Sequence, residues 1–479
     1  MSKRICVVGA GLGGLTAAVR FREAGHEVVL FETADGVGGV WRDNRYPGCA
    51  CDVPAILYQL SFAPNPHWSH HYARQPEILA YAEGLVDAFG LRDSLRLGEG
   101  VARAEWDGAA WTVETTRGAS ERFDAFVPAV GQLSRPSTPD LPGLADFAGE
   151  ASHSARWPAG LDLAGRRVGV VGTAASAVQL IPEVAKAAER LVVFQRTPNW
   201  VAPRNDRAVT PEEKALMWTR PEVAGRLGAM QREMIFENSD QFFWQAFSWT
   251  PEGRTAFERV ARDHLEAQVP DPELRRRLTP DYAIGCKRVL FADDFYPALQ
   301  RENVELDDAP IMRVHPDGVE TKAGRHALDV LVFATGFDAA GWDWSFDVVG
   351  EGGRTLRDGW ADGAAAYLGV LVHGFPNMFV VYGPGTNLGH NSITYMMERQ
   401  VEFAVRALGT RDVTAVREEA QARFDARLQE ELGRTVWADP ACHSWYKRAD
   451  GRITQNWSGN AQSYGEALLG ADPADLEAA

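Results

Sequence analysis

Short runs of branched apolar residues alternate along most of the chain with longer amphipathic stretches. An apolar run at 4–8 leads through a glycine-rich turn at 9–14 into a helical stretch and a second apolar run that ends at Glu32. Residues 166–200 repeat this order of strand, glycine turn, helix and strand. Because strands that alternate with helices build a parallel sheet with helices on its faces, the pattern predicts an α/β fold with two such units.

The pattern becomes helical between about residues 210 and 280, which predicts a helical insertion. This stretch carries a cluster of aromatic residues: Phe236, Phe242, Phe243, Trp244, Phe247 and Trp249. They form either the core of the insertion or part of an apolar substrate pocket, and spacing alone does not choose between the two. Apolar runs followed by glycine turns return at 328–339 and 375–392, where His390 and Asn391 either line a site or cap a helix.

The changes of pattern suggest domain boundaries, and the two apolar runs after the insertion indicate that the first domain is discontinuous. We take the segment Ala334-Thr335-Gly336 as a return to that first domain. The expected order is a first domain at 1–142, a linker at 143–158, a second domain at 159–205, the helical insertion at 206–282, the rest of the second domain at 283–330 and the rest of the first domain at 331–479.

Composition narrows the class of protein. The chain has 479 residues, more than one compact core holds, and its 45% hydrophobic and 24% charged residues are ordinary for a globular protein. A net charge of −16 argues against a nucleic-acid surface, and no apolar run reaches the roughly 18 residues that span a membrane. Five scattered cysteines exclude a disulfide scaffold and a CxxC redox pair. We expect a cytoplasmic enzyme without a bound metal, and its oligomeric state stays open.

The first glycine turn has the spacing GxGxxG, with Gly9, Gly11 and Gly14 at the fixed positions. The first glycine permits a tight turn, the second lets a pyrophosphate approach the backbone, and the third lets the helix pack on the strand. Glu32, at the end of the second strand, is placed to accept hydrogen bonds from ribose hydroxyls. The first unit therefore predicts a bound adenine dinucleotide, and both units predict Rossmann-like domains.

The second glycine turn departs from this spacing because Ala174 occupies the middle glycine position. A methyl group at the closest approach of the pyrophosphate should cost affinity. After the next strand come Arg196 and Thr197 where an acid would select NADH, and a guanidinium favours a 2′-phosphate, so we expect NADPH. The candidate contacts of this unit are Gly172, Thr173, Ser176, Ala177, Arg196 and Thr197.

The segment FAGEASHSARWP at 147–158 lies between the two units and fits the pattern FxGxxxHxxxWP. Its fixed positions are Phe147, Gly149, His153, Trp157 and Pro158. This resembles the fingerprint of the Baeyer–Villiger monooxygenases, and the plain alternative is an interdomain connector. The resemblance implies bound FAD in the first unit and NADPH in the second. It also implies a C4a-peroxyflavin that inserts one oxygen atom of O2 next to the carbonyl of a small-molecule ketone, giving an ester or lactone.

The run GVGGVWRDNRYPGCACDVP also resembles this family, in the segment that contacts the flavin. The resemblance implies flavin contacts at Gly39, Val40, Trp41 and Tyr58. It makes Asp52 the active-site carboxylate, whereas the residues alone also allow Asp52 to be a helix N-cap before Val53 and Pro54.

Lys287 and Arg288 resemble the family segment in which a lysine contacts the 2′-phosphate of NADPH and an arginine supports the flavin peroxide. A fixed cation in a water-poor site stabilises the negative charge of the peroxide and of its ketone adduct. The resemblance therefore makes Arg288 and Asp52 the catalytic residues, with Asp52 orienting Arg288. The segment 147–158 is then expected to act as a hinge.

Two other functions stay open. The first keeps both cofactors but transfers oxygen to nitrogen or sulfur, as related flavin monooxygenases do. The second is a flavin-binding protein without turnover, supported only by Ala174 and by Ala129-Val130-Gly131, where the family usually has Ala-Thr-Gly.

Overall fold

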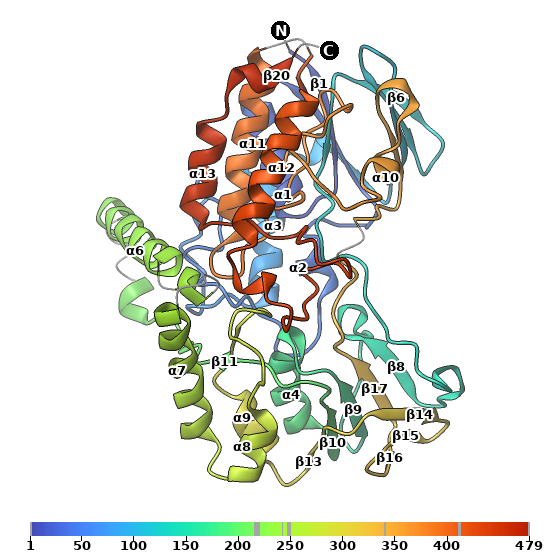
Figure 1. Ribbon diagram of the computed structural model, residues 1–479, viewed down its shortest axis with the longest axis vertical. Helices are drawn as coiled ribbons and strands as arrows, with labels where there is room; N and C mark the ends of the chain where they lie inside the picture. Colours follow the sequence, from blue (N-terminus) through green and yellow to red (C-terminus); the bar gives the residue numbers. More distant parts are fainter. Residues whose placement is uncertain are drawn as a thin grey trace.

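The structure is a computed structural model, and it describes residues 2–214, 221–241, 243–246, 251–339, 342–410 and 413–477. Two parallel sheets lie in opposite halves of the molecule (Figure 1). The first has the order β3-β2-β1-β7, with β1 at Arg4–Val8, β2 at Glu27–Glu32, β3 at Leu95–Leu97 and β7 at Ala125–Pro128. Helices α1 (Leu12–Glu23), α2 (Val40–Asp43) and α3 (Gln75–Ala88) belong to this half.

The second parallel sheet has the order β13-β10-β9-β17-β8. Its strands are β8 (Glu150–His153), β9 (Arg167–Val171), β10 (Arg190–Phe194), β13 (Val304–Asp307) and β17 (Val330–Phe333). Its helices are α4 (Ala175–Ala187), α8 (Pro272–Leu278) and α9 (Phe295–Leu299). The inner strands are apolar and buried, as expected where helices cover a parallel sheet, so the predicted fold with two Rossmann-like domains is confirmed.

Smaller β layers flank both sheets. In the first half they are β4 (Val101–Trp106), β5 (Trp111–Thr115), β6 (Ser120–Phe123) and β18 (Asp347–Val349), and in the second half β14 (Ile311–His315), β15 (Gly318–Thr321) and β16 (Arg325–Ala327). Two short pairs complete the strands: β11 (Val201–Ala202) with β12 (Leu290–Phe291), and β19 (Ala415–Val416) with β20 (Leu476–Glu477).

The helices of the C-terminal part lie in the first half of the molecule, where α11 contacts α1 and α13, and α10 contacts β18 (Figure 1). They are α10 (Leu356–Gly359), α11 (Ile393–Thr410), α12 (Glu418–Leu432) and α13 (Ala461–Leu469). Seven 3-10 turns complete the described chain: Arg92–Ser94, Leu144–Asp146, Ser154–Arg156, Phe243–Ala246, Glu351–Gly353, Val436–Ala438 and Pro473–Asp475. No helix among the described residues is long and apolar enough to cross a membrane.

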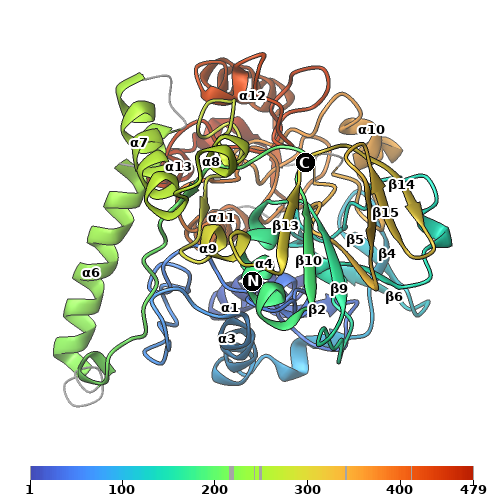
Figure 2. The same ribbon diagram turned by 90° about the horizontal axis from the view of Figure 1, so that it is seen from below.

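The helical insertion contains α6 (Pro221–Gln241) and α7 (Pro251–Gln268), and α6 projects outward in both views (Figures 1 and 2). Asp240 near the end of α6 is buried and accepts hydrogen bonds from Asn391 Nδ2 at 2.8 Å and from the backbone N–H of Gln462 at 2.8 Å. His390 Nε2 lies 3.2 Å from the same carboxylate. His390 and Asn391 therefore join the insertion to the first half of the molecule.

Three members of the predicted aromatic cluster are described. Phe236 packs against Tyr395 of α11, with ring centroids 4.9 Å apart, and Phe243 packs against Phe291 of β12 at 5.6 Å. Trp244 lies 5.5 Å from the ring of His390. These contacts put all three rings in the interface between the insertion and its neighbours. Phe242, Phe247 and Trp249 lie outside the described residues.

The segment 147–158, expected as a linker, contributes a strand to the second sheet. Residues 150–153 form β8, which pairs in parallel with β17 at the edge of this sheet. Gly149 lies directly before this strand. A Cβ atom at this position would lie 2.4 Å from Asp329 O, so the close approach of the two backbone segments requires glycine. His153 is buried, and its Nδ1 accepts a hydrogen bond from the backbone N–H of Ala155 at 3.1 Å. Phe147 and Trp157 are half-buried.

The segment Ala334-Thr335-Gly336 does not return to the first domain as expected. It follows β17, which pairs with β9, and the Ala334 N–H donates to Val171 O at 2.9 Å. In the first half, Ala129 holds the same position after β7, and its N–H donates to Val8 O at 2.8 Å. Each unit thus has its own closing segment, and the second sheet extends to Phe333, beyond the boundary expected at 330.

One disulfide joins Cys286 to Cys442, 156 residues later, with Cα atoms 5.5 Å apart. The scattered cysteines gave no sign of this pair, because nothing in their spacing brings these two positions together. Cys6, Cys49 and Cys51 are free and buried.

Candidate functional site

The first glycine turn has the geometry of a dinucleotide site. Gly9 has φ +98°, and a Cβ atom there would lie 2.7 Å from Ala129 O. At Gly14 a Cβ atom would lie 1.8 Å from Gly9 O, so only glycine lets α1 approach β1 this closely. A Cβ atom at Gly11 would meet only the Cα of Gly39, at 3.7 Å, which leaves the helix N-terminus open to a phosphate.

Glu32 is fixed by the backbone beside this turn. Its carboxylate accepts hydrogen bonds from the N–H groups of Ala10 and Ala34, each at 2.8 Å. It borders a cavity of about 240 Å³ lined by Thr33, Ala34, Gly36, Gly39, Arg42, Asp43 and Arg156. An oriented carboxylate at the rim of a cavity beside an open helix N-terminus fits the ribose and pyrophosphate of an adenine dinucleotide.

The predicted flavin contacts lie together after this turn. Val40 and Trp41 begin the short helix α2, directly after Gly39. The Trp41 indole N–H donates to the Tyr58 hydroxyl at 3.0 Å, and the two rings meet edge to face with centroids 5.5 Å apart. Residues 53–58 form turns rather than a helix, so the N-cap alternative for Asp52 is wrong.

Asp52 and Arg288 form a two-point ion pair. Arg288 Nε donates to Asp52 Oδ2 and Nη2 donates to Oδ1, both at 2.8 Å. Their side chains are 28% exposed for Arg288 and 20% for Asp52, so water screens the pair only in part. Burial acts to raise the pKa of Asp52, but the charge and hydrogen bonds of Arg288 outweigh it and hold that pKa below its usual value. Burial acts to lower the pKa of Arg288, and Asp52 reverses this, so both groups stay charged.

Sequence reasoning missed two phenols on which the charge of Arg288 acts, the half-buried Tyr382 and the buried Tyr446. Tyr382 has φ +59°, and its hydroxyl donates to Asn387 Oδ1 at 2.7 Å. Burial raises the pKa of Tyr446 to about 12, although the nearby charge of Arg288 acts to lower it. Tyr382 directly precedes the turn Gly383-Pro384-Gly385, which could have drawn attention to it. Tyr446 lies in an irregular loop without any such signal.

The second glycine turn repeats the geometry of the first. Gly172 has φ +108°, and a Cβ atom there would lie 2.6 Å from Ala334 O. The Thr173 hydroxyl donates to Thr197 O at 3.3 Å, which ties the turn to the segment after β10. Ala174 is exposed and directly precedes α4, so its methyl group lies at the helix N-terminus, where the missing glycine would be. Ser176 and Ala177 belong to the first turn of α4.

Arg196 and Lys287 place two cations near this turn. Arg196 is exposed, and the Lys287 ammonium lies 4.5 Å from the centre of the Tyr282 ring. Burial lowers the pKa of Lys287, and the charge of Arg196 lowers it further. Two cations close enough to repel each other suit a doubly charged phosphate. The described chain holds no group of three or more His, Cys, Asp or Glu arranged for a metal ion.

The two units meet at the candidate site. Helix α4 of the second unit contacts residues 46–50 of the first, since the Tyr46 hydroxyl donates to Gln179 Oε1 at 3.0 Å and Gln179 Nε2 donates to Ala50 O at 2.9 Å. Asp52 follows this contact directly, and Arg288 lies just before β12 of the second half. The ion pair therefore spans the interface between the two dinucleotide units.

Comparisons with known proteins agree with this organisation. A family model described as an NAD(P)-binding Rossmann-like domain matches residues 7–75, and one described as flavin-binding monooxygenase-like matches residues 98–263. A solved steroid monooxygenase bound to NADP is 34% identical, with a TM-score of 0.87 over 100% of this chain and 99% of that one. OTEMO in complex with FAD and NADP is 27% identical, with a TM-score of 0.88 over 100% and 99% of the two chains.

Among sequence relatives, a Baeyer–Villiger monooxygenase of Streptomyces coelicolor is 41% identical over 484 residues. The match covers 99% of this chain and 92% of the relative. The resemblance inferred from the fingerprint and the cofactor motifs thus extends over nearly the whole length, and the chain belongs to the Baeyer–Villiger monooxygenase family.

Proposed function

We propose that the protein uses NADPH and O2 to insert one oxygen atom next to the carbonyl of a small-molecule ketone, giving an ester or lactone. The observation that carries this proposal is the two-point Asp52–Arg288 ion pair at the interface between two dinucleotide units. Oxygen insertion builds negative charge at the reacting centre, and a fixed guanidinium stabilises it.

The first unit suits FAD. The turn from Gly9 to Gly14 and the N-terminus of α1 would hold the pyrophosphate, and Glu32 would bind the ribose. Trp41 and Tyr58 would line the path toward the flavin ring. When bound and reduced by NADPH, FAD supplies the activation of O2.

The second unit suits NADPH. The turn at Gly172 and Thr173 would hold the pyrophosphate at the N-terminus of α4, and Arg196 with Lys287 would bind the 2′-phosphate. The segment 147–158 would act as the hinge that relates this unit to the first, because its strand β8 is fixed to the second sheet at one edge only.

Asp52 acts by orienting Arg288. Two hydrogen bonds to one carboxylate fix the plane of the guanidinium, so the N–H groups that Asp52 leaves free point in a defined direction. Because both groups stay charged, the pair presents its cation without a proton transfer, and the ketone oxygen meets a donor already in place.

A panel of ketones incubated with the FAD-loaded protein, NADPH and O2 tests the proposal. We expect products that gain one oxygen atom and are identified as esters or lactones by mass spectrometry. Sulfoxides or N-oxides alone, from a matching panel of sulfides and amines, would assign the alternative oxygen transfer. Absence of flavin reduction by NADPH under anaerobic conditions would assign a flavin-binding protein without turnover.

A further inference from the structure

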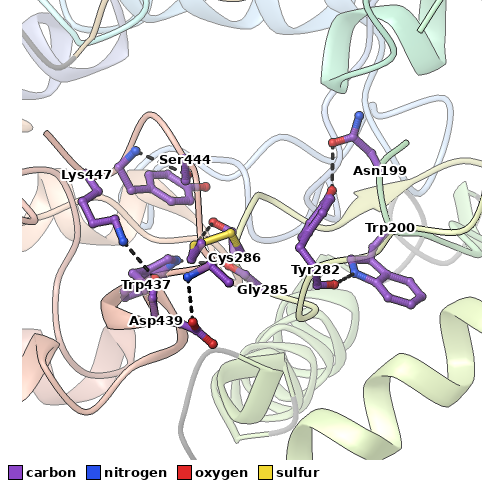
Figure 3. Close-up of a disulfide and its surroundings, with 12 residues drawn as sticks. Asn199, Trp200, Tyr282, Gly285, Cys286, Trp437, Asp439, Ser444 and Lys447 are labelled. Atoms are coloured by element: carbon purple, nitrogen blue, oxygen red, sulfur yellow. Dashed lines mark hydrogen bonds between the residues drawn. A yellow bond between two sulfur atoms is a disulfide. The ribbon is translucent and has the colours of Figure 1, made fainter. Parts of the chain in front are cut away.

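Arg288 is carried by residues 282–288, here called the arginine strap. The strap contains no helix or strand, so its position depends on contacts with neighbouring segments. On the side of the second unit, the Tyr282 hydroxyl donates to Pro198 O at 3.1 Å. The Trp200 indole N–H donates to Tyr282 O at 2.9 Å (Figure 3). These bonds anchor the beginning of the strap.

The rest of the strap is anchored to residues 436–447, here called the C-terminal loop. The Trp437 indole N–H donates to Gly285 O at 3.1 Å, and the disulfide joins Cys286 to Cys442 (Figure 3). Apart from the 3-10 turn Val436–Ala438, the C-terminal loop is irregular. Cys286 is 1% exposed and Cys442 is 3% exposed, so the bond lies inside the contact between loop and strap.

The disulfide is close in sequence to Arg288 on the strap and to Tyr446 on the C-terminal loop. Cys286 is two residues before Arg288, and Cys442 is four residues before Tyr446. Tyr446 is 1% exposed and belongs to the same buried cluster as Cys286 and Cys442, and the charge of Arg288 acts to lower its pKa. A single covalent bond therefore joins the segment that carries Arg288 to the segment that carries Tyr446.

We propose that the Cys286–Cys442 disulfide is a redox-controlled brace that positions Arg288 for oxygen transfer, so that both cysteines are positioning residues. The inference rests on the proposed function of Arg288. When the bond forms in air, the two thiols give two electrons and two protons to O2, which leaves as H2O2. A dithiol reductant returns two electrons and two protons and closes to its own cyclic disulfide.

Reduction of the disulfide should affect oxygen transfer but not the oxidation of NADPH. Lys287 moves with the strap, but Arg196 and the glycine turn at Gly172 lie outside it, so saturating NADPH still binds and is still oxidised. Arg288 keeps Asp52, but the strap loses its covalent anchor and the C-terminal loop is held to it by the Trp437 bond. Because the strap is then held less tightly, the Arg288–Asp52 pair is placed less precisely against the bound ketone, so oxygen transfer falls and the electrons leave as H2O2.

The first experiment counts thiols in the full-length, FAD-loaded protein. In denatured protein that was purified in air, we expect three reactive thiols, which belong to Cys6, Cys49 and Cys51, and five after reduction by dithiothreitol. Limited proteolysis should cut the C-terminal loop faster after reduction. Both readouts are independent of catalysis, so they decide about the brace even if no ketone is oxygenated. Five reactive thiols in the air-equilibrated protein would overturn the proposal.

The second experiment measures product formed per NADPH oxidised. Reduction of the wild type, or Cys286→Ala with Cys442→Ala, should lower this ratio about tenfold and raise H2O2 release, with the rate of anaerobic flavin reduction at saturating NADPH unchanged. Reoxidation should restore the ratio in the reduced wild type and leave the double variant unchanged. The matched control is Cys6→Ala, a free buried cysteine in β1, which should behave as the wild type before and after reduction.

The outcomes separate the brace from a general structural role. Equal loss of flavin reduction and of product per NADPH in the double variant would assign the bond to stability alone and overturn the proposal. An unchanged ratio in reduced wild type, with five thiols counted, would also overturn it. If the double variant fails to fold, the reduced and reoxidised wild type still decides.

Discussion

Arg288→Ala is the most informative single substitution, because it removes the cation and leaves the rest of the site in place. In the wild type, Arg288 holds the pKa of Asp52 below its usual value against the effect of burial. This pair therefore contributes stability above the unfolded pKa of Asp52, and the contribution is lost as pH falls through the lower folded pKa. In the variant, burial is opposed only by a backbone hydrogen bond and the charge of Arg204, so the pKa of Asp52 should rise and the unpaired carboxylate should destabilise the protein at neutral pH.

The structure sets the size of both effects. Removing one partner of a fully buried pair costs about 3–5 kcal/mol, and the partial exposure of these side chains reduces this to about 1–3 kcal/mol at neutral pH. The loss should shrink in acid, where Asp52 of the variant is protonated. For catalysis, losing one fixed donor at a centre of developing charge costs about 10²–10³ in rate. Ester formation should fall by this factor while NADPH still reduces the flavin.

Three measurements check this prediction: anaerobic flavin reduction by stopped flow, ester yield by mass spectrometry, and urea unfolding at neutral and acidic pH. The matched control is Arg167→Ala, which removes a two-point pair with Asp329 at the start of β9, at the opposite end of this strand from Gly172. The control should keep its ester yield. Full ester yield from Arg288→Ala would refute the assigned role of Arg288.

Three further substitutions test the cofactor units. His153→Ala should lower NADPH-dependent turnover while the absorbance of bound FAD stays, and loss of FAD would make the segment 147–158 structural first. Ala174→Gly should lower KM for NADPH about fivefold, because a methyl group at the pyrophosphate is removed, and an unchanged KM would dismiss that argument. Arg196→Ala should raise KM for NADPH about tenfold with little effect on NADH, whereas an equal rise for both would contradict the 2′-phosphate contact.

Local chain chemistry made much of the fold predictable. Both glycine turns follow a buried apolar strand and precede a helix, and Gly9 and Gly172 have the positive φ angles that such turns demand. Helix α12 follows the same rule, because Leu428 and Leu432 lie four residues apart on one face of the helix and are both buried. In each case neighbours in sequence determine the structure, so periodicity is sufficient.

Periodicity could not predict the features that depend on contacts between residues far apart in the sequence. Residues 150–153 have three side chains that are not buried and show no strand pattern, and only the pairing with β17 makes them a strand. The pair Asp52–Arg288 joins residues 236 positions apart and was expected only from the family resemblance. Cys286 and Cys442 meet across 156 residues, and a cysteine count carries no information about such a contact. The assigned roles of the site residues stay predictions.

The central claim is that this chain transfers one atom of O2 to a ketone. The most direct measurement supplies isotopically labelled O2, NADPH and a ketone to the FAD-loaded protein and analyses the product by mass spectrometry. The account predicts an ester or lactone that carries one labelled oxygen atom in its ring or chain, with one NADPH consumed per product. NADPH consumption that yields only labelled H2O2 across the ketone panel, while a sulfide or an amine gains the labelled atom, would contradict it.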